Sequence, residues 1–394
     1  MKITRENSRK ALPAWVLLTA AICLMWLCPA QVQAAKKTTI TISAAGDCTL
    51  GRNYAMGDRN SWNYRYDNQG YSYFLKKVSS IFKKDDLTIV NLEGVLSNSA
   101  KRLKTFYRQK SGKVSKKSYC HLGKPKYLKA LTHGGVDVVS FANNHNIDYG
   151  LQGFKDTVNA CKNYKLPVAY YDTLVRYHVK GLTVGVISID STYCKVSTAE
   201  KYLRQGMADL RHDCDLIIAC MHWGENYVKQ ASSEEKKLGH LCVDLGADMV
   251  LGCHAHILQG VERYKGRYIF YSLGNFTYGG RAVPADVETM IAQQTFTFVD
   301  GKLQIDDNVK IIPCWMSTSK KINNFQPVVK TGSAGRSVID KINSRSKKFS
   351  LKFKYDGTPN VKKEKNTKLP AFTDPYRKLH PSMVPSIIKT LLRM

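Results

Sequence analysis

The chain has 394 residues, a hydrophobic fraction of 43% and a formal net charge of +29. This length allows one large domain or two, and the composition excludes a chain that is disordered throughout. A basic excess of this size favours an anionic wall or capsule polymer, or an acidic membrane surface; a merely soluble lysine-rich surface is the alternative. We expect no nucleic-acid partner, because the sequence has no helix-turn-helix, RNP or zinc-finger pattern.

Residues 1–34 predict an export signal. Basic residues such as Lys2 and Arg5 precede an apolar run at 14–28, and Val32-Gln33-Ala34 offers a candidate cleavage site. The apolar run is shorter than the roughly 20 residues that a membrane span needs, and an uncleaved N-terminal anchor is the alternative. In either case we expect an exported protein that is extracellular or associated with the cell surface and membrane.

Beyond this segment, strand-type and helix-type stretches alternate along the chain. The strand-type runs lie at 38–44, 87–91, 136–142, 182–189, 216–221 and 247–251. Apolar residues at helical spacing lie between them, at 73–84, 124–133, 151–164, 199–212 and 233–245. This alternation predicts an α/β core.

The pattern changes in the second half of the chain. Further strand-type runs at 258–263, 268–272, 290–298 and 303–312 are separated by turns such as Lys265-Gly266 and Asp300-Gly301. They predict a series of antiparallel hairpins, and the whole would suit two packed sheets flanked by helices. Residues 101–119 are basic and polar and predict a long surface loop, a candidate for contact with substrate.

Side chains that can bind metals follow several of the expected strands. They are Asp47, Asn91, Glu93, Asn143, Asn144, His145, His222, His254, His256 and Asn275. The first nine of these residues form five groups in chain order, which implies that one sheet gathers its loop ends into one polar cluster. A mixture of oxygen and nitrogen donors is typical of a hydrolytic metal centre.

Taken singly, most of these residues have an ordinary structural explanation. Asp47 could cap a turn, Asn143 and Asn275 favour turns, and a lone His222 after an apolar strand is more often a core residue. Glu93 is less ordinary, because burying an unpaired charge after a strand is costly.

The pair of histidines at 254 and 256 is the strongest local signal. Gly252 lets the backbone turn, and residues two apart in an extended loop share a face, so His254 and His256 can reach one ion or a pair of ions. The intervening Cys253 should point away and act as a structural residue. Trp223, which follows His222, could form the wall of a pocket.

As an ordered set, the motifs resemble the CapA family of capsule-synthesis proteins, which is linked to poly-γ-glutamate. The matching strings lie at 46–52, 91–94, 142–150, 222–224, 252–257, 264–267 and 271–276. The resemblance covers 38–348 and leaves a basic tail at 349–394, either solvated or a tether to an anionic polymer. It implies kinship with the calcineurin-type metallophosphoesterases and an α/β (α+β) fold, a four-layer αββα sandwich.

That kinship also implies roles for the site residues. Asp47 matches the first metal ligand and Glu93 the bridging carboxylate, Asn144 matches the amide ligand and His145 the proton donor, and His222, His254 and His256 match the imidazole ligands. Asn91, Asn143 and Asn275 would orient these ligands, and the cofactor would be one or two divalent ions of Mn, Zn, Fe or Mg.

The sequence also departs from the pattern. Thr49 stands where the phosphoesterases have a histidine, which puts one metal position in doubt. Cys253 and Ala255 replace the histidine and proline that are common in the family, and the acidic residue after 222–224 is displaced to Glu225.

Two functions fit these observations. The first is an exported metal-dependent hydrolase that acts on a phosphoester or on the amide of an anionic polymer. The second is a non-catalytic carrier or scaffold that binds poly-γ-glutamate or another polyanion during export. Membrane-bound synthesis machinery is a further candidate partner in either case, and the sequence does not decide whether the protein is an enzyme.

Overall fold

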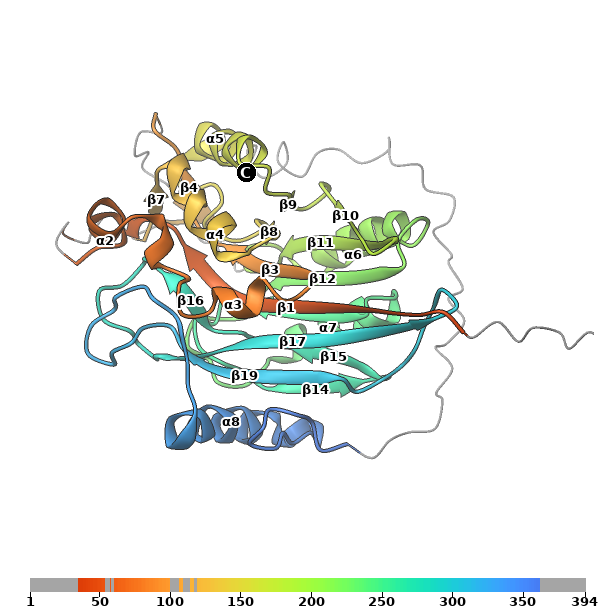
Figure 1. Cartoon of the computed structure of the whole chain (residues 1–394). Coiled ribbons are helices and arrows are strands. Elements are labelled where there is room, and N and C mark those ends of the chain that lie inside the picture. Colours follow the sequence, from red (N-terminus) through yellow and green to blue (C-terminus); the bar gives the residue numbers. More distant parts are fainter. Residues whose placement is uncertain are drawn as a thin grey trace, which may run out of the picture.

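The structure is a computed structural model that describes residues 35–53, 57, 60–99 and 119–361, together with the backbone of 106–108 and 114–116. Two large sheets pack face to face, and helices cover the outer face of each sheet (Figure 1). This arrangement is the four-layer αββα sandwich that the family resemblance predicted. Residues 1–34 and 362–394 and most of the loop expected at 101–119 lie outside the described residues.

The first sheet joins strands from both halves of the chain. Its order is β20 (Val328–Val329), β19 (Val309–Trp315), β17 (Glu288–Val299), β1 (Lys37–Thr49), β3 (Leu87–Leu92), β8 (Val138–Ser140) and β9 (Val168–Ala169), with β16 (Asn275–Tyr278) beside β1 and β18 (Lys302–Leu303) beside β17. The strands β1, β3, β8 and β9 run parallel, whereas β17 runs antiparallel to both β1 and β19. The parallel strands therefore end at one edge of the sheet.

The second sheet has a parallel centre and antiparallel outer strands. Its order is β10 (Val175–Val179), β11 (Leu182–Asp190), β12 (Leu216–His222), β13 (Met249–Cys253), β15 (Arg267–Phe270) and β14 (Val261–Tyr264). The strands β11, β12, β13 and β15 are parallel. Smaller strands pair elsewhere: β2 (Arg52–Asn53) and β4 (Val95–Leu96) with β7 (His121–Gly123), and β5 (Phe106–Arg108) with β6 (Val114–Lys116).

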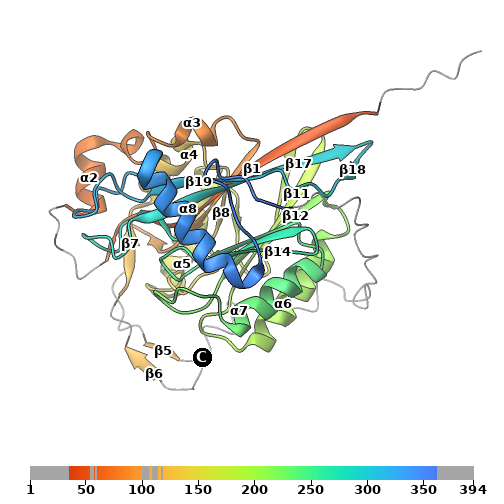
Figure 2. The ribbon, with the colours of Figure 1, turned by 90° about the horizontal axis from the view of Figure 1, so that it is seen from below.

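The helices fall into three groups. On the outer face of the first sheet lie α2 (Trp62–Gln69), α3 (Ser79–Phe82), α4 (Lys129–Gly134) and α5 (Gly150–Asn163), with the 3₁₀ turns η1 (Tyr71–Tyr73) and η2 (Pro125–Leu128). On the outer face of the second sheet lie α6 (Val196–Leu210) and α7 (Ser233–Asp244). The last helix, α8 (Gly332–Ser346), continues into η3 (Lys347–Phe349) and lies along β19 and β14, across the edge of both sheets (Figures 1 and 2).

Strand periodicity explains the layers, as β12 illustrates. Leu216 and Ile218 point into the core between the two sheets, while Ile217 and Ala219 point into the core beneath α6 and α7. All four side chains are fully buried, which is why the strand reads as a continuous apolar run.

The predicted hairpin series divides between the two sheets. The strands β14 and β15 form a hairpin around Lys265-Gly266, but β15 also pairs in parallel with β13 in the second sheet. The strands β17 and β19 instead extend the first sheet. Both antiparallel pairs of the predicted series therefore form, but in different sheets, because alternation of side chains reports the local conformation and not which sheet a strand joins.

The helix α8 closes the open side of the sandwich. Val338, Ile339 and Ile342 enter the core between the sheets, and Leu351 and Phe353 beyond it are also buried there. At these residues the expected tail is therefore part of the folded domain. Among the described residues, no helix combines the length and apolar character that crossing a bilayer requires.

The same helix is fastened to the segment between β13 and β14. The Arg345 guanidinium donates a hydrogen bond to the Leu258 carbonyl, and the Val261 amide donates to Ser346 Oγ over 2.8 Å. A Cβ atom on Gly260 would lie 2.4 Å from the Arg345 carbonyl oxygen, so the two backbones meet directly.

We predict that Ile342→Ala lowers the free energy of unfolding by about 2–5 kcal/mol, because it leaves a cavity in the core between the sheets. The matched change Arg336→Ala, at an exposed position of the same helix, should alter it by less than about 0.5 kcal/mol. Urea denaturation of both variants measures the difference. Equal stability of the two would show that α8 does not belong to the cooperative core.

Candidate metal centre

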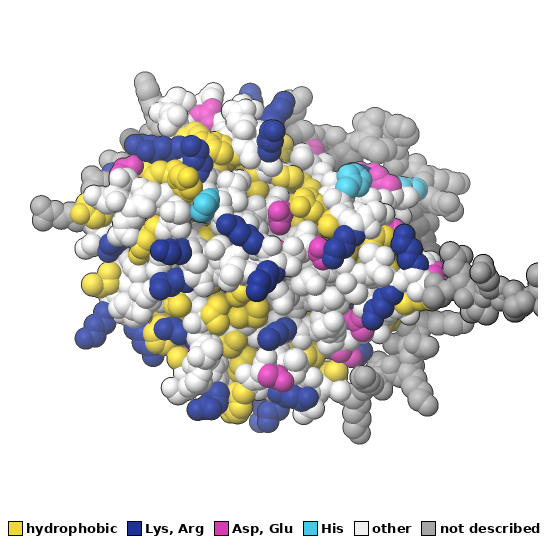
Figure 3. All heavy atoms as spheres, in the orientation of Figure 1, with side chains coloured by type: hydrophobic (Ala, Val, Ile, Leu, Met, Phe, Trp, Pro, Cys, Tyr) yellow, Lys and Arg dark blue, Asp and Glu magenta, His cyan; other side chains and the backbone are white. Residues whose placement is uncertain are grey.

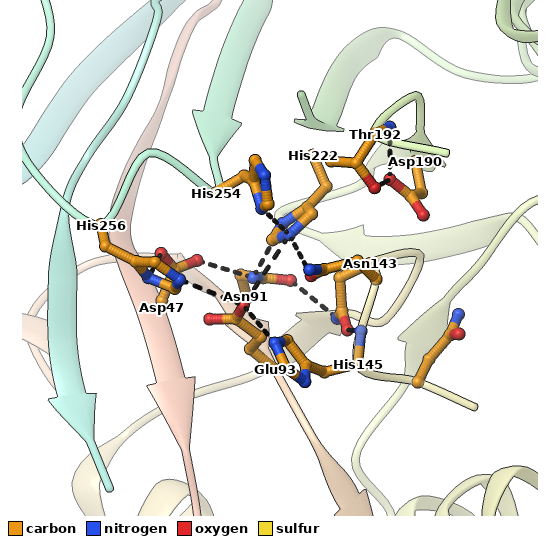
Figure 4. Close-up of polar contacts among 12 residues, drawn as sticks. Asp47, Asn91, Glu93, Asn143, His145, Asp190, Thr192, His222, His254 and His256 are labelled. Carbon is orange, nitrogen blue, oxygen red and sulfur yellow. Dashed lines mark hydrogen bonds and ion pairs between the residues drawn. The ribbon is translucent and has the colours of Figure 1, made fainter. Parts of the chain in front are cut away.

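The predicted site residues come together where strands of both sheets end (Figure 4). Asp47 lies near the end of β1, Glu93 directly after β3, and His222 at the end of β12. His254 and His256 follow β13. The sequence predicted that one sheet would gather these groups, whereas the structure draws them from two facing sheets.

A close contact between two glycines connects β1 to the segment that leads from β15 of the second sheet into β16 of the first. A Cβ atom on Gly46 would lie 1.8 Å from the Gly274 carbonyl oxygen, and the next amide, that of Asp47, donates to the same oxygen over 3.0 Å. Asp47 is consequently in register with Asn91 of β3 on one side and with Asn275 of β16 on the other.

Two groups of side chains could each hold a metal ion, and they share one carboxylate. Glu93, His222 and His254 form one group, and Asp47, Glu93 and His256 form the other, with the ligand atoms of each group within 4.8 Å of one another. Glu93 Oε1 lies 3.8 Å from His222 Nε2 and 3.7 Å from His256 Nε2. Glu93 would therefore be a ligand common to both groups.

The chemistry of these donors fits a divalent ion. Asp47 and Glu93 are fully buried, and buried carboxylates are normally paired or bound to metal because their desolvation is costly. His254 Nδ1 and His222 Nε2 lie only 3.1 Å apart and converge on Glu93 (Figure 4). Imidazole and carboxylate together suit zinc, iron and manganese.

Buried amides hold these groups in place. Asn91 Nδ2 donates to Asp47 Oδ1 over 2.7 Å, and Asn143 Nδ2 donates to Asn91 Oδ1 over 3.2 Å. Asn144 Oδ1 lies 2.9 Å from His222 Nε2, so its oxygen faces the first group. Asn275 Oδ1 lies 2.9 Å from His256 Nδ1 and orients that ring. All four amides that the sequence indicated are therefore at the site.

His145 lies beside the two groups and is oriented by a carboxylate that the sequence analysis did not single out. Its Nδ1 is 2.7 Å from Asp148 Oδ2, and its Nε2 is 3.8 Å from Glu93 Oε1. The pairing with Asp148 fixes the ring so that Nε2 faces the site. The available signal was a carboxylate three residues after the histidine, within what looked like a turn.

A second histidine was missed altogether. The His121 ring lies 4.2 Å from the His145 ring and 5.8 Å from the ring of Tyr278, between their centroids. The His121 amide donates to Asp148 Oδ2 over 2.7 Å, which links β7 to the oriented His145. Nothing in the sequence around His121 marks it, because a separate small sheet carries it to the site.

The loop with the paired histidines has strained backbone. His254 has φ of 99° and His256 has φ of 57°, in the region that side chains other than glycine rarely adopt. Such strain persists where the surroundings fix it and is common at functional sites.

Gly252 is not in a turn, as the sequence analysis expected, and a different constraint requires a glycine at this position. It lies within β13, and a Cβ atom there would meet the Tyr271 carbonyl oxygen at 2.1 Å.

Two neighbours of the site are structural. Trp223 is buried in the core under α6 and α7, and its indole donates to the Tyr271 carbonyl over 2.8 Å, so it does not form a pocket wall as expected. Cys253 is buried, and burial together with the Asp47 carboxylate raises the pKa of its thiol well above the usual value. The thiol therefore stays protonated in the metal-free protein.

Thr49, in place of the family histidine, is buried and leaves the Asp47 group with a single imidazole.

The four-layer fold and the paired donor groups define a protein of the metallophosphoesterase-like class. Residues 41–279 match the family described as "Bacterial capsule synthesis protein PGA_cap", and the chain belongs to this family.

Two curated relatives agree with this assignment. The chain is 30% identical over 288 residues to "Capsule biosynthesis protein CapA" of Bacillus anthracis, a match that covers 67% of this chain and 64% of that protein. It is 24% identical over 307 residues to "PGA biosynthesis protein CapA" of Bacillus subtilis (strain 168), covering 71% and 76%. A solved structure of a hypothetical protein from Thermus thermophilus aligns with a TM-score of 0.41 and 16% identity, over 70% of this chain and 99% of that one.

The charge of His256 couples metal binding to pH. Burial alone lowers the pKa of His256, but the carboxylates of Glu93 and Asp47, with the hydrogen bond to Asn275, outweigh it and raise the pKa to about 9. At neutral pH the metal-free protein therefore carries a proton on this ring, which a metal ion must displace.

We predict that the affinity for Mn²⁺ rises about tenfold per pH unit from neutrality to about pH 9 and then levels off, because one proton is released on binding. Calorimetric titrations at a series of pH values measure this slope. His256→Gln, which has no titrating ring, serves as the matched control and should show a shallower slope. An affinity of the unmodified protein that does not change over this range would contradict the prediction.

Proposed function

We propose that the chain is an exported, metal-dependent hydrolase of capsule-polymer production that cleaves a γ-glutamyl amide or a phosphoester of an anionic substrate. The observation that carries this proposal is Glu93, shared by two metal-type donor groups and faced by an imidazole that Asp148 orients. The family description and the names of the relatives, which refer to capsule and PGA biosynthesis, support a polymer as the substrate.

Divalent ions of manganese, zinc, iron or magnesium at these groups would supply activation of water and of the bond to be broken. The chain's own residues supply position and protons. His145 can hold a proton on Nε2, next to Glu93, and deliver it to a leaving nitrogen or oxygen, while Asp148 stabilises the charged ring. His222 is kept in place by Asn144 and Asn91, so its ligating nitrogen has a fixed direction.

Residues 1–34 support the proposed location, because their basic and apolar segments are typical of export by way of a signal peptide or anchor. A capsule polymer and membrane-bound synthesis machinery would both be accessible to a protein at the cell surface. The net charge of +29 supports contact with a polyanion there.

The same charge favours the second candidate, a carrier or scaffold without turnover. In the face shown in Figure 3, lysine and arginine side chains are spread over the surface and outnumber the acidic ones, without gathering into one patch. Binding of this kind weakens steeply with salt, because it rests on screened charges.

We predict that the purified protein contains stoichiometric divalent metal, and that His254→Ala loses it while His145→Ala retains it. The His145 variant should lose turnover by about 10²–10⁴-fold, as expected for a missing proton donor. Elemental analysis measures the metal, and a screen with γ-glutamyl oligomers and phosphoesters measures turnover.

His240→Ala provides the control, since this histidine lies outside the site and pairs with Glu262. Absence of metal from the unmodified protein would contradict the proposal. Bound metal with no turnover of either substrate, together with salt-sensitive binding of poly-γ-glutamate, would favour the carrier instead.

A further inference from the structure

We propose that Arg281 and Tyr227 form a subsite next to the metal centre that binds a carboxylate of the substrate, the free α-carboxylate of a γ-linked glutamyl unit. This inference rests on the proposed function, because it assigns a substrate class to the same site. It concerns two residues that none of the sequence motifs includes.

The position of Tyr227 is set by the loop that carries the paired histidines. Its amide donates to the Ala255 carbonyl over 2.8 Å, midway between His254 and His256. Its ring centroid lies 6.1 Å from that of His256, and the residue is 40% exposed. A positive φ of 63° accompanies this placement. Tyr227 therefore connects the site to the solvent.

Arg281 is brought to the same place by a different element. It follows β16, in which Asn275 orients His256 and Tyr278 places its ring 4.9 Å from the His256 ring. His256 thus contacts an aromatic ring from each of the two segments. The segment with Tyr227 follows His222 at the end of β12, and the segment with Arg281 follows Asn275 of β16, so both leave from the site.

The buried side-chain amide of Asn323 holds the backbone around Arg281 in place. Asn323 Nδ2 donates to the carbonyl of Tyr278 over 2.8 Å and to that of Arg281 over 2.9 Å, and the Asn323 amide donates to the Ala282 carbonyl over 2.8 Å. A Cβ atom on Gly279 would lie 1.8 Å from the Gly51 carbonyl oxygen, so the segment packs directly on its neighbour. This exposed arginine consequently stands on a well-defined backbone.

The side chain of Arg281 is oriented but keeps its charge available. One of its terminal nitrogens donates to the Tyr227 hydroxyl over 2.8 Å, and its guanidinium carbon lies 5.7 Å from the Tyr227 ring. Within the part of the chain that the structure describes, no carboxylate pairs with it, whereas Arg263 and Arg267 each have an aspartate partner. A phenol uses one donor and leaves the others for a ligand.

The chemistry of the remaining donors selects the ligand. The planar fork of a guanidinium matches the two oxygens of a carboxylate, and such pairs are both stronger and more specific than contacts of a lysine. A γ-linked glutamyl chain carries one free carboxylate on each unit, next to each amide. With an amide at the metal centre, a neighbouring carboxylate can reach Arg281 across Tyr227.

The test compares two short oligomers of γ-linked glutamate, one with free α-carboxylates and one in which these are carboxamides. Binding to the full chain is measured by calorimetry. Arg281→Ala should weaken binding of the acidic oligomer about tenfold, the loss expected for a partly exposed charged pair, and leave binding of the amide oligomer unchanged. Tyr227→Phe should weaken the acidic oligomer by a smaller factor, because it removes only the hydroxyl that holds the arginine.

Arg336→Ala removes the same charge at an exposed position of α8, outside the pair of Arg281 and Tyr227, and should change neither affinity. The inference is overturned if Arg281→Ala binds the acidic oligomer as tightly as the unmodified protein does, or if it loses both oligomers equally. Metal content is measured on the same samples. Its absence from every sample would refute the hydrolase, while the comparison of the two oligomers would still decide the subsite.

Discussion

The contact between Gly46 and Gly274 is the constraint on which the site depends. With no side chain on Gly46, β1 of the first sheet approaches the segment that follows β15 of the second until their backbones hydrogen bond. With this approach, the carboxylates of β1 and β3 face the imidazoles that follow β12 and β13. The metal-type groups are thus a property of the seam between two sheets, which neither sheet could form alone.

Burying these groups at the seam lowers the stability of the metal-free protein, and the contacts of the site offset part of this effect. Asp47 and Glu93 are fully buried, and burying each charged carboxylate without a partner would cost several kcal/mol of folding free energy. Asn91 donates to Asp47, and the protonated His256 lies 3.2 Å from Asp47 Oδ2 and 3.7 Å from Glu93 Oε1. The other three asparagines orient Asn91 and the imidazoles without adding charge. The strained conformation of His254 adds to this cost. A site arranged in this way favours binding of cations over the stability of the metal-free protein.

The sequence indicated much of this arrangement for an identifiable reason. Buried parallel strands have apolar runs, and a polar residue directly after such a run lies at a strand end, so the group from Asp47 to His256 could be read in order. The sheet that each strand joins could not be read from the sequence, because long-range packing decides it. For this reason the two expected hairpins lie in different sheets. His121 and Asp148 were not identified as site residues for a related reason. Their role depends on contacts between a small separate sheet and a turn.

The attachment of α8 to the segment after His256 limits how the protein can be shortened or fused. Arg345 and Ser346 bind the backbone at Leu258 and Val261, so the last helix braces the segment that follows the paired histidines. A version trimmed before this helix would lose more than its basic end, since the brace would go with it. Affinity tags, surface immobilisation and fusion partners must therefore leave this helix and the buried Leu351 and Phe353 intact.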